Sequence, residues 1–226
     1  AASEILVNQS TAFMAAANQE QPLAPPVLSL GFDSLGFNDN ASQNGTFNIP
    51  PDSDSAIGTH YVINVVNSII QFHKKDDGTV VFTDSLYDFF SAESPNTNTF
   101  DPKVIFDPRE GRFVFVTLEK EDDGADGNPE VSKIFVAVSD DANPNGTWCS
   151  TTIDGKTFIN GRDRWADYPG FAVDEEAVYI TANMFGFEES GENSSVAVRL
   201  WIIEKGVESN GFFDLQTQKP QRVMQE

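Results

Sequence analysis

The sequence has few of the residue types on which most catalytic and metal centres depend. It contains one cysteine, Cys149, and two histidines, His60 and His73. A single cysteine excludes a disulfide within these residues, and two histidines are too few for a multi-histidine metal site. The sequence also lacks a Gly-x-Ser-x-Gly turn, a His-Glu-x-x-His helix and a phosphate-binding glycine loop. The motifs of the common hydrolases and nucleotide-binding enzymes are therefore missing.

Basic residues are also scarce. The chain has 14 Lys+Arg against 35 Asp+Glu, which gives a net charge of −21 at pH 7. A field of this sign repels phosphate backbones and anionic lipids and attracts cations, so nucleic acid is not an expected partner. The charge has two interpretations. It is either a solvated surface that keeps the protein soluble, or a supply of carboxylates, some of which bind a cation such as Ca²⁺.

No stretch of 18 apolar residues is present, so the sequence predicts no membrane span, and the first residues do not have the pattern of a signal peptide. Asn-x-Ser/Thr sequons in predicted loops are typical of secreted or cell-surface proteins, although such short patterns also arise by chance. These predicted glycosylation sites are Asn8, Asn40, Asn44, Asn145 and Asn193.

Short apolar runs alternate with polar turns along most of the chain, and 39% of the residues, including 19 Phe, are hydrophobic. The pattern repeats in three segments, 60–82, 101–154 and 167–205, when Asp101-Pro102 is aligned with Asp167-Tyr168-Pro169. Helical periodicity is almost absent. Repeats of this kind predict an all-β protein, a β-propeller of four-stranded antiparallel blades.

The predicted division is an N-terminal arm and linker over residues 1–56 and propeller blades over 57–226. About three blades are expected, whereas a closed ring takes roughly four to eight. The chain is therefore expected to be part of a six- to eight-bladed ring, with the rest supplied by a missing propeller half or a partner chain. A sandwich or an open sheet is the alternative.

Oxygen-bearing side chains recur near the starts and ends of the predicted inner strands. Such strands line the channel of a propeller, so these side chains can converge, and Ca²⁺ takes six to eight oxygen ligands. The alternative is that each residue ties a turn by accepting from a loop amide. The candidate metal ligands are Asn64, Asn67, Asp101, Asp107, Asp167, Asp174 and Asn183.

Two polar loops offer weaker signals. Residues 121–130 place Asp122 and Asp126 as in part of a calcium loop, but the ligand pattern is incomplete and an acidic hairpin loop is the alternative. Residues 139–148 are loosely similar to the Asp-box turn of sialidase-type propellers. There the Asp and Asn residues are expected to tie the turn, and Trp148 to pack between blades.

An aromatic and charged segment is the predicted recognition patch. Arg164, Trp165 and Tyr168 combine rings that stack on sugars with groups that bond hydroxyls. His60 begins a strand and is expected to reach a channel mouth, whereas His73 stands beside two lysines and is expected to face solvent. Burial of Trp165 between blades is the alternative.

Four stretches together resemble a family of secreted or cell-surface bacterial-type β-propeller proteins. They are PPDSDSAIGTHYVINVVN, FDPKVIFDPREGRFVF, IFVAVSDDANPNGTW and WADYPGFAVDEEAVYITANMF, and the resemblance covers about residues 26–205. It implies a propeller ectodomain, often one module of a longer exported polypeptide, and no particular activity. The chain departs from the family pattern at Phe106, Phe113 and Asn143, where Tyr, Trp and Asp are usual.

Three functions are compatible with these patterns. The first is an extracellular, non-enzymatic propeller for binding, adhesion or surface assembly, stabilised by Ca²⁺ and bound to a glycan or a surface protein. The second is a carbohydrate-active enzyme, a hydrolase or lyase, that uses a carboxylate pair at the channel mouth. The third is a structural matrix protein whose edge strands or half-rings pair between chains.

Overall fold

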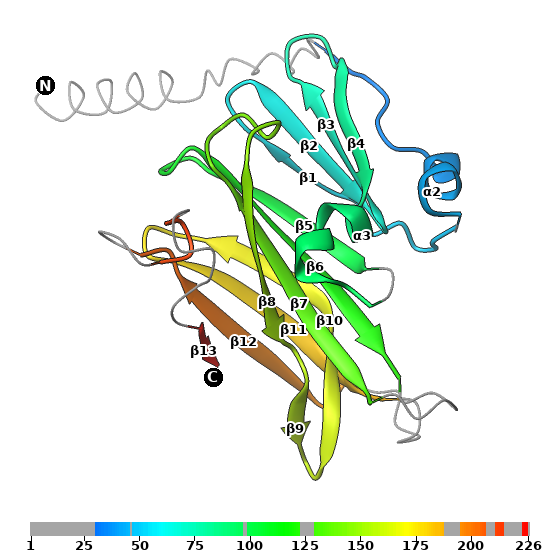
Figure 1. Ribbon diagram of the computed structural model, residues 1–226, viewed down its shortest axis with the longest axis vertical. Coiled ribbons are helices and arrows are strands. Elements are labelled where there is room, and N and C mark those ends of the chain that lie inside the picture. The colour runs from blue at the N-terminus through cyan, green and yellow to red at the C-terminus, as the bar shows by residue number, and fades with distance from the viewer. Residues whose placement is uncertain are drawn as a thin grey trace, which may run out of the picture. The chain divides into compact units, whose positions relative to one another are not determined.

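The computed structural model describes residues 30–45, 47–96, 99–122, 129–187, 195–206, 211–214 and 223–225 (Figure 1). The chain divides into two compact units, residues 1–31 and 32–226, and every helix and strand described below belongs to the second. Strands dominate that unit, so the all-β prediction is confirmed. No helix in the described ranges is both long and apolar enough to cross a membrane.

Three antiparallel sheets follow one another along the chain, and in each of them consecutive strands are hydrogen-bonded neighbours. The first sheet contains β1 (Asp54–Ile57), β2 (Tyr61–Val66), β3 (Ile69–Lys74) and β4 (Val80–Ser85). The second contains β5 (Phe100–Asp107), β6 (Arg112–Glu121), β7 (Val131–Ser139) and β8 (Trp148–Asp154). The third contains β9 (Thr157–Ile159), β10 (Arg162–Val173), β11 (Ala177–Gly186), β12 (Ala197–Glu204) and β13 (Val223–Gln225).

Short helices occupy two of the connections. Helix α2 (Phe37–Asn44) precedes the first sheet, and α3 (Leu86–Phe89) with the 3₁₀ helix η1 (Ser91–Glu93) joins the first sheet to the second. Helix α2 and the start of β1 lie in the polar stretch 38–55, which has the composition of a linker. A four-residue edge strand such as β1 depends on main-chain pairing with β2, which polar side chains do not prevent.

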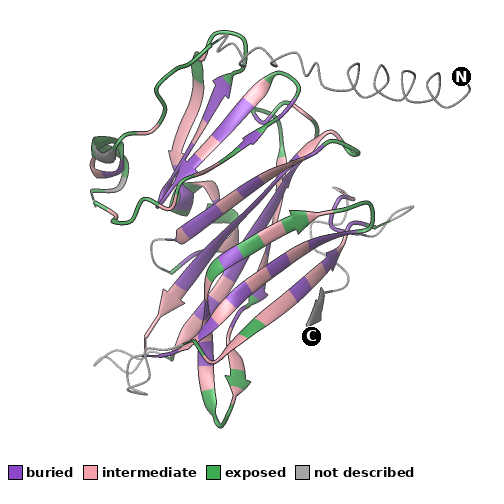
Figure 2. Cartoon of the chain, turned by 180° about the vertical axis from the view of Figure 1, so that it is seen from behind, coloured by how far each residue is buried: buried purple, intermediate pink, exposed green. Residues whose placement is uncertain are grey.

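The second sheet is covered on both faces. Its residues Val114, Val116 and Leu118 belong to a core cluster shared with the third sheet. The alternate residues Phe113 and Phe115 belong to a cluster shared with the first sheet. Because both faces are buried, β6 and β7 read as nearly continuous apolar runs, and Figure 2 shows these strands largely in the buried colour.

Aromatic rings join the first sheet to the second. The Trp148 ring on β8 lies 6.1 Å from the Phe72 ring on β3 and 5.2 Å from the Phe89 ring on α3. The turn before Trp148 is tied as predicted: the Asp141 carboxylate accepts from the Asn143 amide at 2.6 Å, and the indole donates to the Pro144 carbonyl at 2.8 Å. The prediction that Trp148 packs between sheets is confirmed.

His73 does not face solvent, contrary to the expectation from its lysine neighbours. Its side chain is fully buried, because strand alternation places it opposite the exposed Lys74. Its ring nitrogens lie 3.1 Å from the Gly78 carbonyl and 3.2 Å from the Ser34 hydroxyl, and Phe32 packs against the ring at 5.0 Å. His73 therefore anchors the segment before α2 to the first sheet.

A buried ion pair joins the second sheet to the third. The Lys205 amine, after β12, donates to the Asp107 carboxylate at the end of β5 and to the Asp174 carbonyl. Both side chains of the pair are almost wholly buried, and Lys205 also lies 5.1 Å from the centre of the Phe213 ring. The pair satisfies two groups that would otherwise be buried without a partner.

We expect Lys205→Met to lower the free energy of unfolding by about 3–5 kcal/mol, because it leaves the Asp107 carboxylate buried and unpaired. Urea unfolding followed by fluorescence measures the change. The matched control is Lys156→Met, which breaks a more exposed contact with Asp163 of 3.5 Å and is expected to cost less than about 1 kcal/mol. Equal losses in the two variants would contradict a structural role for the buried pair.

Candidate functional site

Strands β5 and β10 contain the same irregularity, and the chain has a matching one just before β1. In β5, Asp101 and Pro102 stand opposite one residue of β6, and in β10 the same bulge contains Tyr168 and Pro169. Asp101 and Tyr168 have positive φ angles of 50° and 49°, which are unusual for residues other than glycine. Asp52, just before β1, has a φ of 44°.

Asp52 occupies the equivalent place in the first sheet. The Asn67 amide donates to the Pro51 carbonyl at 2.7 Å, whereas the regular pairing of β1 with β2 starts at Asp54 opposite Val65. Asp101 therefore matches Asp52 and Tyr168 in the repeat, and not Asp167. The alignment of Asp101 with Asp167 is wrong by one residue, because the two Pro residues mark the bulge and the Asp residues do not.

The bulges bring together a cluster of polar groups that we call the acid clasp: Asp52, Asn67, Asp101, Asp167 and the main-chain amide of Tyr168. Asn67 donates to Asp52 at 2.6 Å and accepts from the Asp101 amide at 2.6 Å. Asp101 in turn accepts from the Tyr168 amide at 3.1 Å. The clasp thus links all three sheets through side-chain to main-chain hydrogen bonds.

The Asp101 and Asp167 carboxyl groups hydrogen-bond to each other. Burial, followed by the nearby charges of Asp167 and Asp52, raises the pKa of Asp101 to about 7. Burial also raises the pKa of Asp167, while the Lys120 ammonium opposes that shift. Two carboxyl groups in contact share one proton, so the pair is expected to carry a single charge near neutral pH.

The clasp contains three of the predicted metal ligands, Asn67, Asp101 and Asp167. Asp107 instead pairs with Lys205, and Asp122 pairs with Lys120 at 2.8 Å. Asp174 accepts from the amides of Glu176 and Ala177 at 2.8 and 2.9 Å, so it ties a turn.

The other two predicted asparagine ligands lie apart from the clasp's hydrogen bonds. Asn64 is half-buried in the middle of β2, opposite Gln71, and Asn183 is half-buried on β11, opposite Asp167. Asp126 lies outside the described residues. Within the described ranges, no group of three or more His, Cys, Asp or Glu side chains is placed to hold a metal ion.

The predicted recognition residues separate into buried and exposed groups. Arg164 is buried, and Trp165 is half-buried, with its indole donating to the Gly186 carbonyl at 3.0 Å and its ring 4.6 Å from the Lys120 amine. Tyr168 is 60% exposed, and the Lys103 amine lies 5.3 Å from its ring centre. Tyr168 is thus the member of this segment that offers a ring to a ligand.

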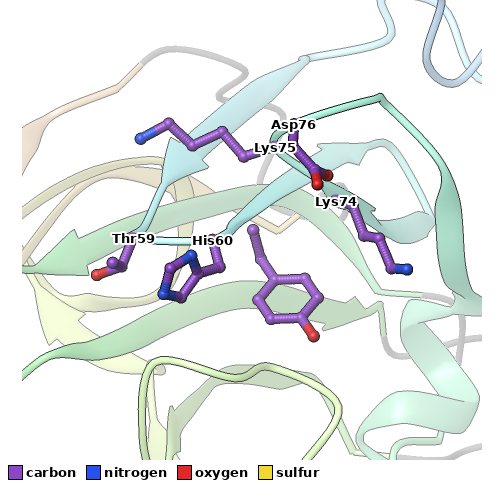
Figure 3. A pocket seen from close by; sticks show the side chains of 6 residues that line it. Thr59, His60, Lys74, Lys75 and Asp76 are labelled. Carbon is purple, nitrogen blue, oxygen red and sulfur yellow. The ribbon is translucent and has the colours of Figure 1, made fainter.

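His60 is exposed at a different place, beside an open pocket of about 310 Å³ in the first sheet. Its lining residues come from the β1–β2 and β3–β4 turns: Thr59, His60, Tyr61, Lys74, Lys75 and Asp76. Figure 3 shows the Lys74 and Lys75 side chains pointing to opposite sides, and the Lys75 amine donates to the Gly58 carbonyl at 3.2 Å. The two cations therefore do not converge on one ligand.

The described sequons differ in exposure. Asn40 in α2 is buried, with 2% of its surface exposed, and Asn145 stands exposed on the turn before β8. The other predicted glycosylation sites, Asn8 and Asn193, and the side chain of Asn44 lie outside what the structure describes. Asn145 is the described sequon whose amide is accessible.

The clasp contains one residue that the sequence patterns did not mark as a ligand, Asp52, whereas Asn67 was a candidate ligand and is bonded to Asp52 and Asp101. Asp52 follows two prolines, and a Pro residue also lies within one or two residues of Asp101 and Asp167, so proline spacing was the available signal. Asn67 ends a strand with no such neighbour. Comparisons with known proteins add no relative: no family model, curated protein or solved structure matches this chain.

The clasp makes stability depend on pH. With raised pKa values, the folded chain binds more protons than the unfolded chain between the ordinary aspartate pKa of about 3.9 and about 7. The free energy of unfolding is therefore expected to fall as pH rises through this window. We expect Asp101→Asn to reduce this decrease in the free energy of unfolding, because its side-chain amide does not titrate but still donates and accepts hydrogen bonds. Urea unfolding from about pH 5 to about pH 8 measures it.

The control for this prediction is Asp76→Asn, which removes an exposed carboxylate outside the clasp. The free energy of unfolding of this variant is expected to change with pH as it does in the wild type. If Asp101→Asn also keeps the wild-type dependence on pH, the clasp does not titrate in this range and the shared proton is refuted.

Proposed function

We propose that this chain is part of an extracellular, non-enzymatic β-propeller module that binds a glycan on a surface partner. The proposal rests chiefly on Tyr168, an exposed ring at the bulge in the middle of β10. The experiment that tests it is binding of the intact chain to arrayed glycans.

The arrangement of the sheets supports the propeller part of the proposal. Each sheet is a meander of neighbouring antiparallel strands, as in a propeller blade, and β5 contacts both β1 and β10. Strands β5 and β10 also contain equivalent bulges, and Asp52 before β1 has a similar positive φ. In a ring of blades, the innermost strands of neighbouring blades lie side by side, as β1, β5 and β10 do here. The remaining blades would come from a further segment or a partner chain.

The geometry of Tyr168 supports the binding part. Its main chain is held in the left-handed region by the bond from its amide to Asp101, so the position of the ring is fixed before a ligand arrives. Backbone strain of this kind is often kept where it serves a site. An exposed aromatic face stacks on a sugar ring, and the adjacent Lys103 can bond sugar hydroxyls or an acidic sugar.

The carboxylate geometry favours binding over glycoside hydrolysis. Retaining hydrolases hold their two carboxyl groups about 5 Å apart and inverting hydrolases hold them further apart. A hydrogen bond between the Asp101 and Asp167 side chains contributes to their pKa shifts, so we infer that this pair lies closer together than either class of hydrolase requires. A carbohydrate-active enzyme therefore remains the second candidate, and it needs a different pair of carboxylates.

Calcium is a subsidiary part of the proposal. Asp52, Asp101 and Asp167 provide oxygen atoms of the type that Ca²⁺ prefers. As described, however, the residues do not form a cage, and the shared proton would have to leave first. The donor set thus does not fit a preformed calcium site.

If the clasp does take up Ca²⁺, the ion is expected to raise the melting temperature more at about pH 8, where the shared proton is lost, than at about pH 5. Differential scanning calorimetry with CaCl₂ and with EDTA measures the effect. Asp101→Asn is expected to remove it. A melting temperature that is equal with CaCl₂ and with EDTA at both pH values would reject calcium at this site.

Tyr168→Ala is expected to weaken glycan binding by roughly fivefold to thirtyfold, because it removes the stacking face, which is worth about 1–2 kcal/mol. Tyr168→Phe keeps that face and is expected to bind nearly as well as the wild type. Glycan arrays followed by titration calorimetry with a bound glycan provide the measurement.

The matched control is Tyr87→Ala, which removes another exposed tyrosine, 40% exposed, on α3. It is expected to bind as the wild type does. Absence of glycan binding by the wild type, or equal binding by Tyr168→Ala, would refute the proposed site. Release of shortened glycan products by the wild type would favour the enzyme instead.

A further inference from the structure

The turn between β9 and β10 presents an Asn-Gly pair to solvent. Asn160 and Gly161 are both exposed, and their φ angles are positive, at 53° and 83°. Ile159 pairs with Arg162 across the turn, so the chain forms a two-residue hairpin turn of the kind that Asn-Gly favours. This hairpin is the lowest part of the view in Figure 1, and Figure 2 shows its end largely in the exposed colour.

The side chain of Asn160 and the main-chain nitrogen of Gly161 can react with each other without an enzyme. The nitrogen attacks Cγ of the Asn160 amide, and the new N–Cγ bond closes a five-membered succinimide ring. The Cγ–Nδ2 bond breaks, and Nδ2 leaves as ammonia with the proton from the Gly161 nitrogen. Water then opens the ring at one of its two carbonyl carbons and gives either aspartate or isoaspartate. Glycine favours the attack because it has no Cβ to hinder the approach.

We propose that Asn160 is a site of spontaneous deamidation in the folded chain. The attack requires the peptide between Asn160 and Gly161 to rotate out of the turn, so its rate depends on how readily the turn opens. Strand β9 has three residues and lies at the edge of its sheet, and Phe158 at its centre is 70% exposed. The Gly161 amide makes no main-chain hydrogen bond with another described residue. Opening this end of the hairpin therefore breaks few contacts.

A second exposed Asn-Gly pair, Asn145 and Gly146, is held more firmly. The Gly146 amide donates to the Asn143 carbonyl at 3.0 Å, and the Asn145 side chain donates to the Asn143 side chain at 3.1 Å. The indole of Trp148 donates to the Pro144 carbonyl of the same turn at 2.8 Å. Two identical dipeptides thus differ in how firmly their main chain is held, and Asn160 is expected to react first.

The two products affect the hairpin differently. Aspartate leaves the main chain unchanged, and Asp-Gly also suits this type of turn, so this product adds a negative charge and keeps the hairpin. Isoaspartate directs the main chain through the former side-chain carbon and lengthens it by one atom. A two-residue turn then no longer places Ile159 opposite Arg162. Isoaspartate is therefore expected to release β9 from β10.

The test is incubation of the intact, unglycosylated chain in mildly alkaline buffer, followed by peptide mapping with mass spectrometry. In the folded chain, the Asn160 peptide is expected to deamidate on the order of tenfold faster than the Asn145 peptide, because less structure has to open. In concentrated urea, where neither turn is held, the two peptides are expected to react at similar rates. Hydrogen exchange over β9 measures the loss of pairing in the isoaspartate product.

The matched variant is Asn160→Gly, because Gly-Gly also suits the turn but has no side-chain amide. It is expected to fold as the wild type does and to release less ammonia from the folded chain. Equal ammonia release by the two proteins would overturn the proposal. So would an Asn160 peptide that reacts in urea but not in the folded chain, or one that reacts no faster than the Asn145 peptide when folded. Neither measurement involves a glycan, so deamidation and the proposed function can fail independently.

Discussion

The fold depends on how the main-chain amides at the free edges of β5 and of β10, beyond its pairing with β9, find acceptors. An edge strand presents N–H groups that no neighbouring strand bonds, and burying them without a partner costs stability. Here side-chain oxygens of the preceding sheet supply the acceptors. Asp54 accepts from the Val104 amide at 3.0 Å, and Asn67 and Asp101 accept from the bulged residues of β5 and β10. The Ser132 hydroxyl accepts from Ala166 at 3.1 Å.

This requirement explains why oxygen-bearing side chains gather where the sheets meet. A carboxylate that accepts from an amide must lie close to the next sheet, and three repeats bring several such groups into one place. Burial then raises the pKa values of Asp101 and Asp167, and the charge of Asp167 raises that of Asp101 as well. The unusual electrostatics of the clasp is thus a consequence of joining sheets by their edges.

The sequence predicted the strands of the second sheet well, because β6 and β7 are long apolar runs between turn residues. It also predicted that Asp101 and Asp167 meet, although the bulge shifts their alignment by one. It did not predict the partners of Asp107 or the burial of His73, because Lys205 and Ser34 are remote in sequence. A carboxylate that accepts hydrogen bonds from the amides of a turn and a carboxylate that binds a cation can have the same local sequence. The positions of the groups around the carboxylate distinguish the two.

The direction of the bonds between sheets has a consequence for how the chain assembles. In each of these four bonds the acceptor precedes the donor amide in the sequence: Asp54, Asn67, Asp101 and Ser132 all come before their partners. Each sheet is itself a continuous segment of chain, so its own contacts are local. A chain that emerges from its N-terminus therefore has these four side-chain acceptors in place before the amides that bond to them.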